Sequence, residues 1–190
     1  AALAAAQTCI IQELITLGAD VNLTDADGFT PLAAAVESRD LQAVKVLLAA
    51  GAKVDRGDLV YNSPLTLAIA WGEPEAVKLL LNAGADENAT IEFRDSSIPV
   101  FGYAAASGSA DVLEMLFRRG AKIDMRFGIG EVTPLMYAAT AKRVSTVKKL
   151  IELGADVNLT SSKGNSALTL AGLNHAEGAF EVLLATRAPL

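Results

Sequence analysis

A chain of 190 residues with a formal net charge of −6 disfavours a nucleic-acid partner, because such a partner requires a positive protein surface that displaces counterions. Hydrophobic residues make up 52% of the chain and aromatic residues only 5%, and these small side chains suit closely packed helices better than a cavity for a large apolar cofactor. The single cysteine, Cys9, cannot form an internal disulfide, which is typical of a reducing compartment.

A sequence unit recurs along the chain and is clearest over 27–55. It begins with an Asp-Gly turn, continues with Thr-Pro-Leu and an Ala-rich run, and ends with a second amphipathic run closed by Gly-Ala. The closing step recurs at spacings of 33, 33, 36 and 34 residues, at Gly18, Gly51, Gly84, Gly120 and Gly154. The Thr-Pro-Leu step or a weaker version of it starts at Thr30, Ser63, Pro99, Thr133 and Ser166. A period near 33 residues, built of a turn and two helices, is typical of a solenoid.

The first elements of the chain are predicted from the residues that start and end helices. Residues 1–6 fit the end of a first helix and 8–17 a second helix, which Gly18 terminates because glycine adopts a positive φ at little cost. This segment has the character of a repeat whose beginning is missing, as in an excerpt from a longer protein. The first full unit has a finger turn at 25–29, with Thr30 as the helix N-cap and Pro31 at the first helical position.

The later units are predicted to have altered fingers. The second finger is apolar over 59–62, the third is about three residues longer within 92–97, and the fourth, 125–132, is one residue longer and apolar. The fifth unit, 166–190, ends in Arg-Ala-Pro and is expected to be a C-terminal cap. The helix pairs of the second to fourth units are expected at 63–71 and 73–82, at 99–107 and 110–119, and at 133–141 and 145–153.

In these features the chain resembles the ankyrin-repeat family, whose unit of about 33 residues carries Thr-Pro-Leu-His-x-Ala. The resemblance implies an all-α solenoid of stacked helix–turn–helix units with β-hairpin-like fingers, forming a single domain over 1–190. The expected units are a partial repeat over 1–24, repeats over 25–57, 58–90, 91–124 and 125–160, and a cap repeat over 161–190. The family histidine, which supports the turn by hydrogen bonding, is replaced by Ala33, Thr66, Gly102, Met136 and Thr169. Other contacts are therefore expected to hold the fingers.

Residues suited to catalysis are scarce. His175, the single histidine, falls where the repeat places a glycine between its two helices, and nothing in the sequence supplies its partner for general-base work. One histidine and one cysteine cannot assemble a zinc site of the usual kind. Asp25 and Asp27 flank a turn, where their side chains are expected to cap backbone amides. We therefore expect no catalytic residues, no metal and no cofactor, and a protein that is not an enzyme.

The resemblance implies a partner-binding surface formed by the fingers and the exposed ends of the first helices. Large aromatic side chains are enriched at binding hot spots, so Trp71 and Tyr61, which belong to one repeat and should lie near each other, are the leading candidates. Packing between fingers is the alternative for each, and longer fingers can fold back on aromatic residues such as Phe127. Tyr103 and Tyr137 are expected to pack between repeats. The predicted partner-binding residues are Phe29, Glu37, Tyr61, Asn62, Trp71, Phe93, Arg94, Ile129, Val132, Asn165 and Asn174.

The function that this pattern favours is a non-catalytic protein–protein interaction module. The expected partner is another protein, with no nucleic acid and no membrane insertion, and the chain is expected to be monomeric and intracellular, in the cytoplasm. The apolar N-terminal segment lacks the basic region of a signal peptide. One alternative is an architectural or regulatory spacer within a longer multidomain protein, and a weaker one is a small-molecule receptor or an enzyme. A pull-down with the isolated segment separates the first two, and a thermal-shift screen of metabolites tests the third.

Overall fold

The structure is a computed structural model that describes residues 2–26, 28–55, 63–93 and 96–186, without the side chains of residues 2–7, 92 and 93. The chain divides into two compact units, Ala1–Asp86 and Glu87–Leu190, and each is described by itself. Short helices arranged in pairs dominate both units, with one two-stranded sheet in the described part of the chain. The predicted all-α class of stacked helix pairs is therefore confirmed.

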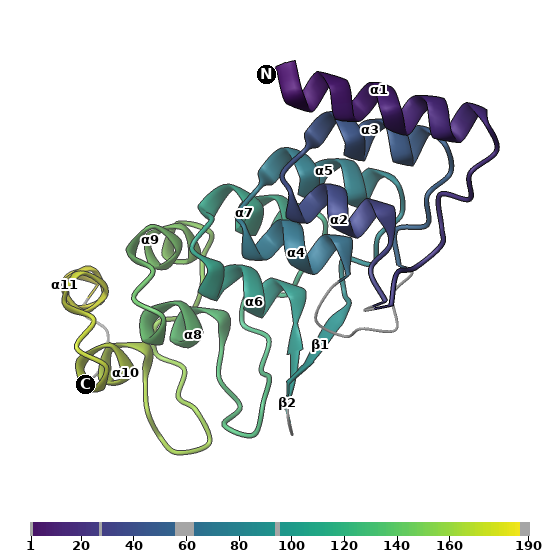
Figure 1. The fold of residues 1–190 in the computed structure, drawn as a ribbon. Coiled ribbons are helices and arrows are strands. Elements are labelled where there is room, and N and C mark those ends of the chain that lie inside the picture. The colour runs from purple at the N-terminus through teal and green to yellow at the C-terminus, as the bar shows by residue number, and fades with distance from the viewer. Residues whose placement is uncertain (1, 27, 56–62, 94–95, 187–190) are drawn as a thin grey trace. The chain divides into compact units, whose positions relative to one another are not determined.

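The first unit consists of two rows of helices. Its elements are α1 Ala2–Thr16, α2 Pro31–Glu37, α3 Leu41–Ala49, α4 Pro64–Ala70 and α5 Pro74–Asn82. The first helices α2 and α4 pack against each other, and the second helices form the other row, in which α3 packs against both α1 and α5 (Figure 1). The core lies between the rows, where Leu32 and Leu65 from first helices meet Val44, Leu47 and Leu80 from second helices, all of them buried.

The N-terminal segment differs from the prediction. Two helices were expected, over 1–6 and 8–17, whereas α1 is one continuous helix from Ala2 to Thr16. A break between two helices requires a residue that leaves the helical conformation easily, as Gly72 does at φ 65°. The segment Ala6–Thr8 offers no glycine or proline, and the alanine-rich run before it propagates a helix readily. The end of the helix is as predicted, with Gly18 at φ 90°.

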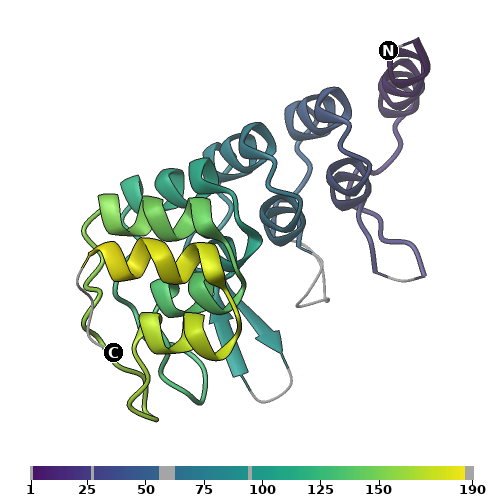
Figure 2. The same ribbon diagram turned by 90° about the vertical axis from the view of Figure 1, so that its left-hand side faces the viewer.

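The second unit repeats the arrangement with three helix pairs. Its elements are β1 Thr90–Phe93, β2 Ser96–Pro99, α6 Val100–Ser107, α7 Ala110–Arg118, α8 Pro134–Thr140, α9 Val144–Glu152, α10 Ala167–Leu173 and α11 Glu177–Ala185. The first helices form the row α6, α8, α10 and the second helices the row α7, α9, α11. Figures 1 and 2 show the yellow pair α10 and α11 beside the green pair α8 and α9.

Most first helices begin with the same local structure. An N-cap hydroxyl accepts a hydrogen bond from the backbone N–H three residues later, which satisfies one of the amides that a helix start leaves without a partner. The cap residues and their distances are Thr30 at 3.1 Å, Ser63 at 3.2 Å, Thr133 at 3.3 Å and Ser166 at 3.2 Å. Helix α6 starts differently: Pro99 supplies no side-chain cap, and the Val100 N–H donates to the Ala89 carbonyl at 2.9 Å, so the β1–β2 hairpin anchors the helix.

Other side chains occupy the position of the family histidine, and two of them make hydrogen bonds at the starts of their helices. The Thr66 hydroxyl donates to the Ser63 carbonyl at 2.9 Å. The sulfur of Met136 accepts from the Thr133 N–H at 3.5 Å, completing a reciprocal cap. Both contacts lie within the first turn of the helix, so the expectation that other contacts hold the fingers stays a prediction.

The connection between the two helices of a repeat adopts a left-handed conformation. Gly72 and Gly108 take φ values of 65° and 94°, which are unstrained for glycine. Arg39, Lys142 and His175 occupy the equivalent place with φ values of 57°, 60° and 51°. His175 is exposed there, and its place between the two helices, where other repeats have glycine, is as predicted. A left-handed conformation costs roughly 1–2 kcal/mol for a residue with a side chain.

Candidate partner-binding surface

The surface predicted from the sequence is best defined around Trp71 in the first unit. Trp71 is the C-cap of α4, where its backbone N–H donates to the Leu67 carbonyl at 3.0 Å, and its side chain remains 48% exposed. The guanidinium of Arg39 lies 4.9 Å from the centre of the Trp71 ring. Arg39 Nε also lies 3.4 Å from Glu73 Oε1. A cation from one repeat therefore contacts an aromatic ring and a carboxylate of the next.

This cluster, Arg39–Trp71–Glu73, presents an aromatic side chain together with both signs of charge. A cation over an exposed indole is worth about 0.5–1 kcal/mol, and an exposed ion pair about 0–1 kcal/mol. Together these contacts restrict the orientation of the ring, so a partner that covers Trp71 would lose little side-chain entropy on binding. Sequence reasoning selected Trp71 but missed Arg39 and Glu73. Arg39 stands between the two helices of its repeat, where Gly72 stands one repeat later. A charged residue in place of a glycine was the feature of the sequence that could have drawn attention to it.

Two other predicted residues of the first unit differ in accessibility. Glu37 is exposed at the last position of α2. Phe29 is only half-buried, and its backbone closes the finger: its N–H donates to Asp25 Oδ1 at 2.9 Å, and its carbonyl accepts from the Asp25 N–H at 3.0 Å. Phe29 thus keeps part of its side chain accessible on a turn that hydrogen bonds hold in shape.

The fourth finger of the second unit displays an exposed apolar tip. Ile129 is 78% exposed, and behind it Phe127 and Val132 form an antiparallel bridge with backbone hydrogen bonds of 3.1 Å. The next finger supports this one, because the Ser162 N–H donates to the Gly130 carbonyl at 2.9 Å. Ile129 therefore projects from a braced loop, and Val132, another predicted residue, is half-buried beside it.

Phe127 is buried and does not belong to the accessible surface, so the fold-back alternative is the one that the structure shows. Its ring occupies the space that Gly102 leaves by lacking a side chain: a Cβ on Gly102 would lie 2.5 Å from the ring atom Cζ. The ring also meets Tyr137 edge to face, with 5.5 Å between ring centres. Tyr103 and Tyr137 are half-buried, and burial, with Tyr137 nearby, raises the pKa of the Tyr103 hydroxyl. Phe127 thus packs the fourth finger against α6 of the preceding repeat and α8 of its own repeat.

Two predicted asparagines are engaged in local hydrogen bonds. The Asn165 backbone closes the fifth finger, its N–H donating to Ser161 Oγ at 3.3 Å and its carbonyl accepting from the Ser161 N–H at 2.9 Å. Asn174 is the C-cap of α10, and its side-chain amide donates to the Leu170 carbonyl at 2.8 Å. Both are half-buried. Each has a structural role that accounts for its place, which makes them weaker candidates than Trp71 and Ile129.

The side chains of four predicted residues lie outside the described part of the structure. Tyr61, Asn62 and Arg94 lie outside the described residues. The expected proximity of Tyr61 to Trp71 therefore stays a prediction. The backbone of Phe93 pairs with Ser96 in the β1–β2 hairpin, and its side chain is outside the description. The third finger is accordingly a hairpin, which agrees with the extra length predicted for it.

The second helices of the second unit carry a network of charges. Glu114 contacts Arg118 on its own helix at 2.6 Å and Lys149 of the next second helix at 3.2 Å. The hydrogen bond from Arg118, followed by that from Lys149, lowers the pKa of the Glu114 carboxyl. Lys149 also lies 3.1 Å from Glu152, and its hydrogen bonds to Glu152 and Glu114 raise the pKa of its ammonium group. This network links α7 to α9.

Within the described residues, no three histidine, cysteine, aspartate or glutamate side chains gather as a possible metal site. In that same part of the chain, no helix combines the length and the apolar character that crossing a membrane would require.

Stacked helix pairs with capped turns, left-handed connections and projecting fingers define a helical repeat protein. The chain belongs to the ankyrin-repeat family: the family profile described as "Ankyrin repeats (3 copies)" matches residues 1–91 and 101–188. Ankyrin repeats are in general protein–protein interaction modules.

Among curated proteins, the chain is similar to "Ankyrin repeat and SOCS box protein 6" of Mus musculus. The two are 36% identical over 86 residues, which cover 42% of this chain and 20% of the mouse protein. The similarity thus extends over a minor part of that protein's length.

Proposed function

We propose that the chain is a non-catalytic interaction module that binds another protein through the finger and first-helix surface, with Trp71 as the main anchor. The observation that carries this proposal is the half-exposed Trp71, whose ring is contacted by Arg39, which in turn pairs with Glu73. Tryptophan and arginine dominate binding hot spots because they bury much area and tolerate loss of water. A helix end that keeps such a ring accessible offers a partner an oriented apolar contact.

The second unit has an exposed apolar side chain of its own at the tip of the fourth finger. Ile129 is exposed on a loop that the fifth finger braces, so it can enter a partner's pocket without ordering the loop first. The formal net charge of −6 favours a partner whose contacting surface is neutral or basic, because like charges slow association and weaken the complex.

Substitution of Trp71 tests the proposal. Affinity capture with the wild type and with Trp71→Ala side by side identifies partners that depend on this residue, and calorimetry with the purified partner then measures the affinity. We expect Trp71→Ala to weaken binding roughly 30-fold or more, since hot-spot truncations cost about 2 kcal/mol or more. The thermal midpoint should fall only slightly, because the ring is already half in water and the cation contact is worth about 0.5–1 kcal/mol.

The matched control is Leu184→Ala, which removes another exposed apolar side chain but from the second helix α11. Its affinity should match that of the wild type. Equal binding by Trp71→Ala together with a loss in Leu184→Ala would place the interface on the second helices and refute the proposal.

A further inference from the structure

The start of α9 in the second unit carries basic side chains around an exposed serine. Ser145 is the second residue of α9 and is exposed, as are its neighbours Lys142, Arg143 and Lys148. These cations stand three and two residues before the serine and three residues after it. Within the described residues, none of the three forms an ion pair, in contrast to Lys149. The function proposed above makes no use of this cluster.

Two side chains at the start of α9 hold the turn that follows α6 in the preceding repeat. The Ser145 hydroxyl donates to the Gly108 carbonyl at 3.2 Å, and Arg143 Nε donates to the Ala106 carbonyl at 2.8 Å. The stem of Arg143 also covers Gly108, where an added Cβ would lie 2.9 Å from Arg143 Cδ. This side of the junction between the two repeats therefore depends on a neutral hydroxyl and a guanidinium that stand two residues apart.

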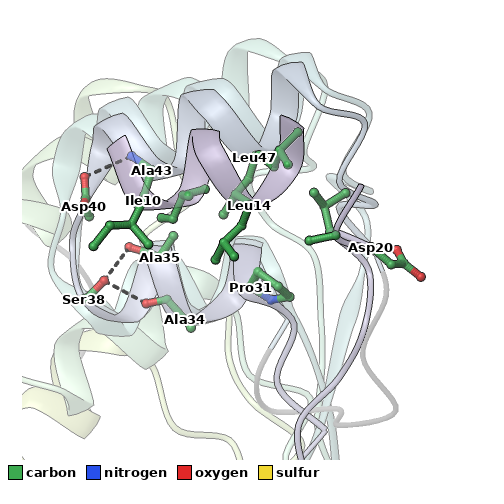
Figure 3. Close-up of a pocket in the computed structure, with 14 residues that line it drawn as sticks. Ile10, Leu14, Asp20, Pro31, Ala34, Ala35, Ser38, Asp40, Ala43 and Leu47 are labelled. Carbon is green, nitrogen blue, oxygen red and sulfur yellow. Dashed lines mark hydrogen bonds between the residues drawn. The ribbon is translucent and has the colours of Figure 1, made fainter. Parts of the chain in front are cut away.

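An exposed serine of the first unit has different surroundings. Ser38 is the C-cap of α2, and its hydroxyl donates to the carbonyls of Ala34 and Ala35 in its own helix at 2.9 and 3.1 Å (Figure 3). Glu37 precedes it directly, and the basic residue near it, Arg39, comes after it. Ser38 is therefore a matched control: an exposed serine beside an inter-helix turn, without basic residues on its N-terminal side.

We propose that Ser145 is a phosphorylation site for a protein kinase that selects basic residues on the N-terminal side of the serine. Such a kinase binds its substrate through an acidic groove, so the charge pattern decides the choice of serine. Ser145 Oγ attacks the γ-phosphorus of Mg²⁺-bound ATP, and the bond from that phosphorus to the β-phosphate oxygen breaks. ADP leaves, and the hydroxyl proton passes to the catalytic aspartate of the kinase. The proposal stands independently of the function proposed for Trp71.

A small local opening brings this serine into the extended form that a kinase groove binds. Lys142 and Arg143 precede the helix and already have non-helical backbones, with φ 60° for Lys142 and φ −93° and ψ 78° for Arg143. Extending the chain as far as Ser145 unwinds the first turn of α9 and breaks the hydrogen bond from the Val147 N–H to the Arg143 carbonyl. Opening of a terminal helical turn is among the least costly motions of a folded chain.

The phosphate changes the contacts that α9 makes with the preceding repeat. The ester oxygen of a phosphoserine carries no proton, so residue 145 loses its bond to the Gly108 carbonyl. Its charge of about −1.5 to −2 at pH 7 attracts the Arg143 guanidinium. Because charge-assisted hydrogen bonds are roughly twice as strong as neutral ones, Arg143 turns from the Ala106 carbonyl to the phosphate. A negative charge in the first turn also stabilises α9 itself, so phosphorylation strengthens this helix start and weakens its hold on the preceding turn.

The first test incubates the folded chain with Mg²⁺-bound ATP and the catalytic subunit of protein kinase A, a kinase directed to basic residues, and maps the phosphate by fragment mass spectrometry. We expect one phosphate at Ser145 and none at Ser38. Lys142→Gln removes one cation on the N-terminal side and should slow the reaction about tenfold, as loss of one charged contact implies. Lys148→Gln, the same change at an exposed lysine after the serine, should leave the rate near that of the wild type.

The second test measures amide exchange in the phosphorylated chain. The reporters are two N–H groups: Val147, which donates to the Arg143 carbonyl at 2.9 Å, and Leu113, which donates to the Ser109 carbonyl at 3.1 Å at the start of α7. We expect exchange at Val147 to slow about threefold, as a favourable charge at a helix start implies. Exchange at Leu113 should quicken about fivefold, as loss of one hydrogen bond in the turn before it implies.

Three results would overturn the site: phosphate on Ser38 with Ser145 unmodified, equal rates for Lys142→Gln and Lys148→Gln, or modification of Ser145 only after urea has unfolded the chain. Phosphorylation at Ser145 that leaves exchange at both Val147 and Leu113 unchanged would overturn the effect assigned to the phosphate. Thermal midpoints of the two lysine variants close to that of the wild type show that both are folded, so a difference between their rates reports charge alone.

Discussion

Thr146 offers a direct measurement of what one unsatisfied polar group costs in this fold. Its side chain is buried on α9, and Oγ1 has no hydrogen-bond partner. In the other repeats the same position of the second helix holds an apolar residue, for example Ala43, Ala76 or Val112, all buried. Valine has nearly the shape of threonine, and Val112 shows that the repeat accommodates it. In Thr146→Val, a methyl group therefore takes the place of a hydroxyl that is buried without any hydrogen-bond partner.

The expected gain follows from the cost of desolvating a hydroxyl. Leaving such a group buried without a partner costs about 1–3 kcal/mol, and threonine and valine have similar helix propensities. We expect Thr146→Val to increase the free energy of unfolding by about 1–2 kcal/mol. For a chain of this length, each kcal/mol raises the thermal midpoint by about 2–4 °C. Because a repeat stack can unfold in segments, amide exchange within α9 provides the local measurement beside urea denaturation.

The matched control is Thr140→Val, in which the hydroxyl has a partner. Thr140 Oγ1 donates to the Met136 carbonyl at 2.9 Å and the residue is half-buried. Its replacement should be neutral or lower the stability by up to about 1 kcal/mol. The prediction fails if the urea midpoint of Thr146→Val is below that of the wild type, or is no higher than that of Thr140→Val. Either result would show that the buried hydroxyl carries no such penalty.

Two further predictions concern the second unit. Gly102→Ala should lower the free energy of unfolding by about 1–3 kcal/mol, because the new methyl group would overpack against Phe127. In the control Gly172→Ala, the new Cβ would meet its nearest atom at 3.5 Å, and the higher helix propensity of alanine should raise the free energy of unfolding by about 0.5–1 kcal/mol. Equal urea midpoints for the two variants would refute the contact between Gly102 and Phe127. Glu114→Gln should lower the thermal midpoint at pH 7, because Arg118 lowers the pKa of the native carboxyl. A carboxyl with a depressed folded-state pKa stabilises above its unfolded pKa and loses that contribution as the pH falls through its folded pKa, so a difference from the wild type that grows on acidification would contradict this account.

Local punctuation made much of the fold predictable from the sequence. A cap hydroxyl followed by proline favours a helix start, and α2, α4 and α8 begin directly after Thr30, Ser63 and Thr133. The glycine that follows α1, α3, α5, α7 and α9 likewise ends those helices through its own positive φ. The same reasoning failed at α1, where the repeat implied a break but the residues in place do not supply one. Periodicity predicts which elements should exist, and the local residues decide whether they form.

Contacts between repeats were less predictable, because they depend on how one unit sits against the next. The hydrophobic pattern marks Phe127 as an aromatic residue in a finger, but its burial is decided by the absence of a side chain at Gly102, 25 residues earlier in the sequence. Arg39 is similar. Within its own repeat it is an exposed residue in a turn, and its contacts with Trp71 and Glu73 arise only when the next repeat is in place. Sequence reasoning therefore found the ring of the candidate surface and missed the two charges around it.

The junction between successive repeats is held by different chemistry in the two units. In the first unit, the N-cap position of the second helix is acidic, and Glu73 receives the charge of Arg39. In the second unit the same position holds Ser109, Arg143 and Ala176, none of them acidic, and Arg143 donates from Nε to the Ala106 carbonyl at 2.8 Å in the preceding repeat. A basic residue after the preceding first helix is favourable only in the first case, since it would oppose Arg143 in the second.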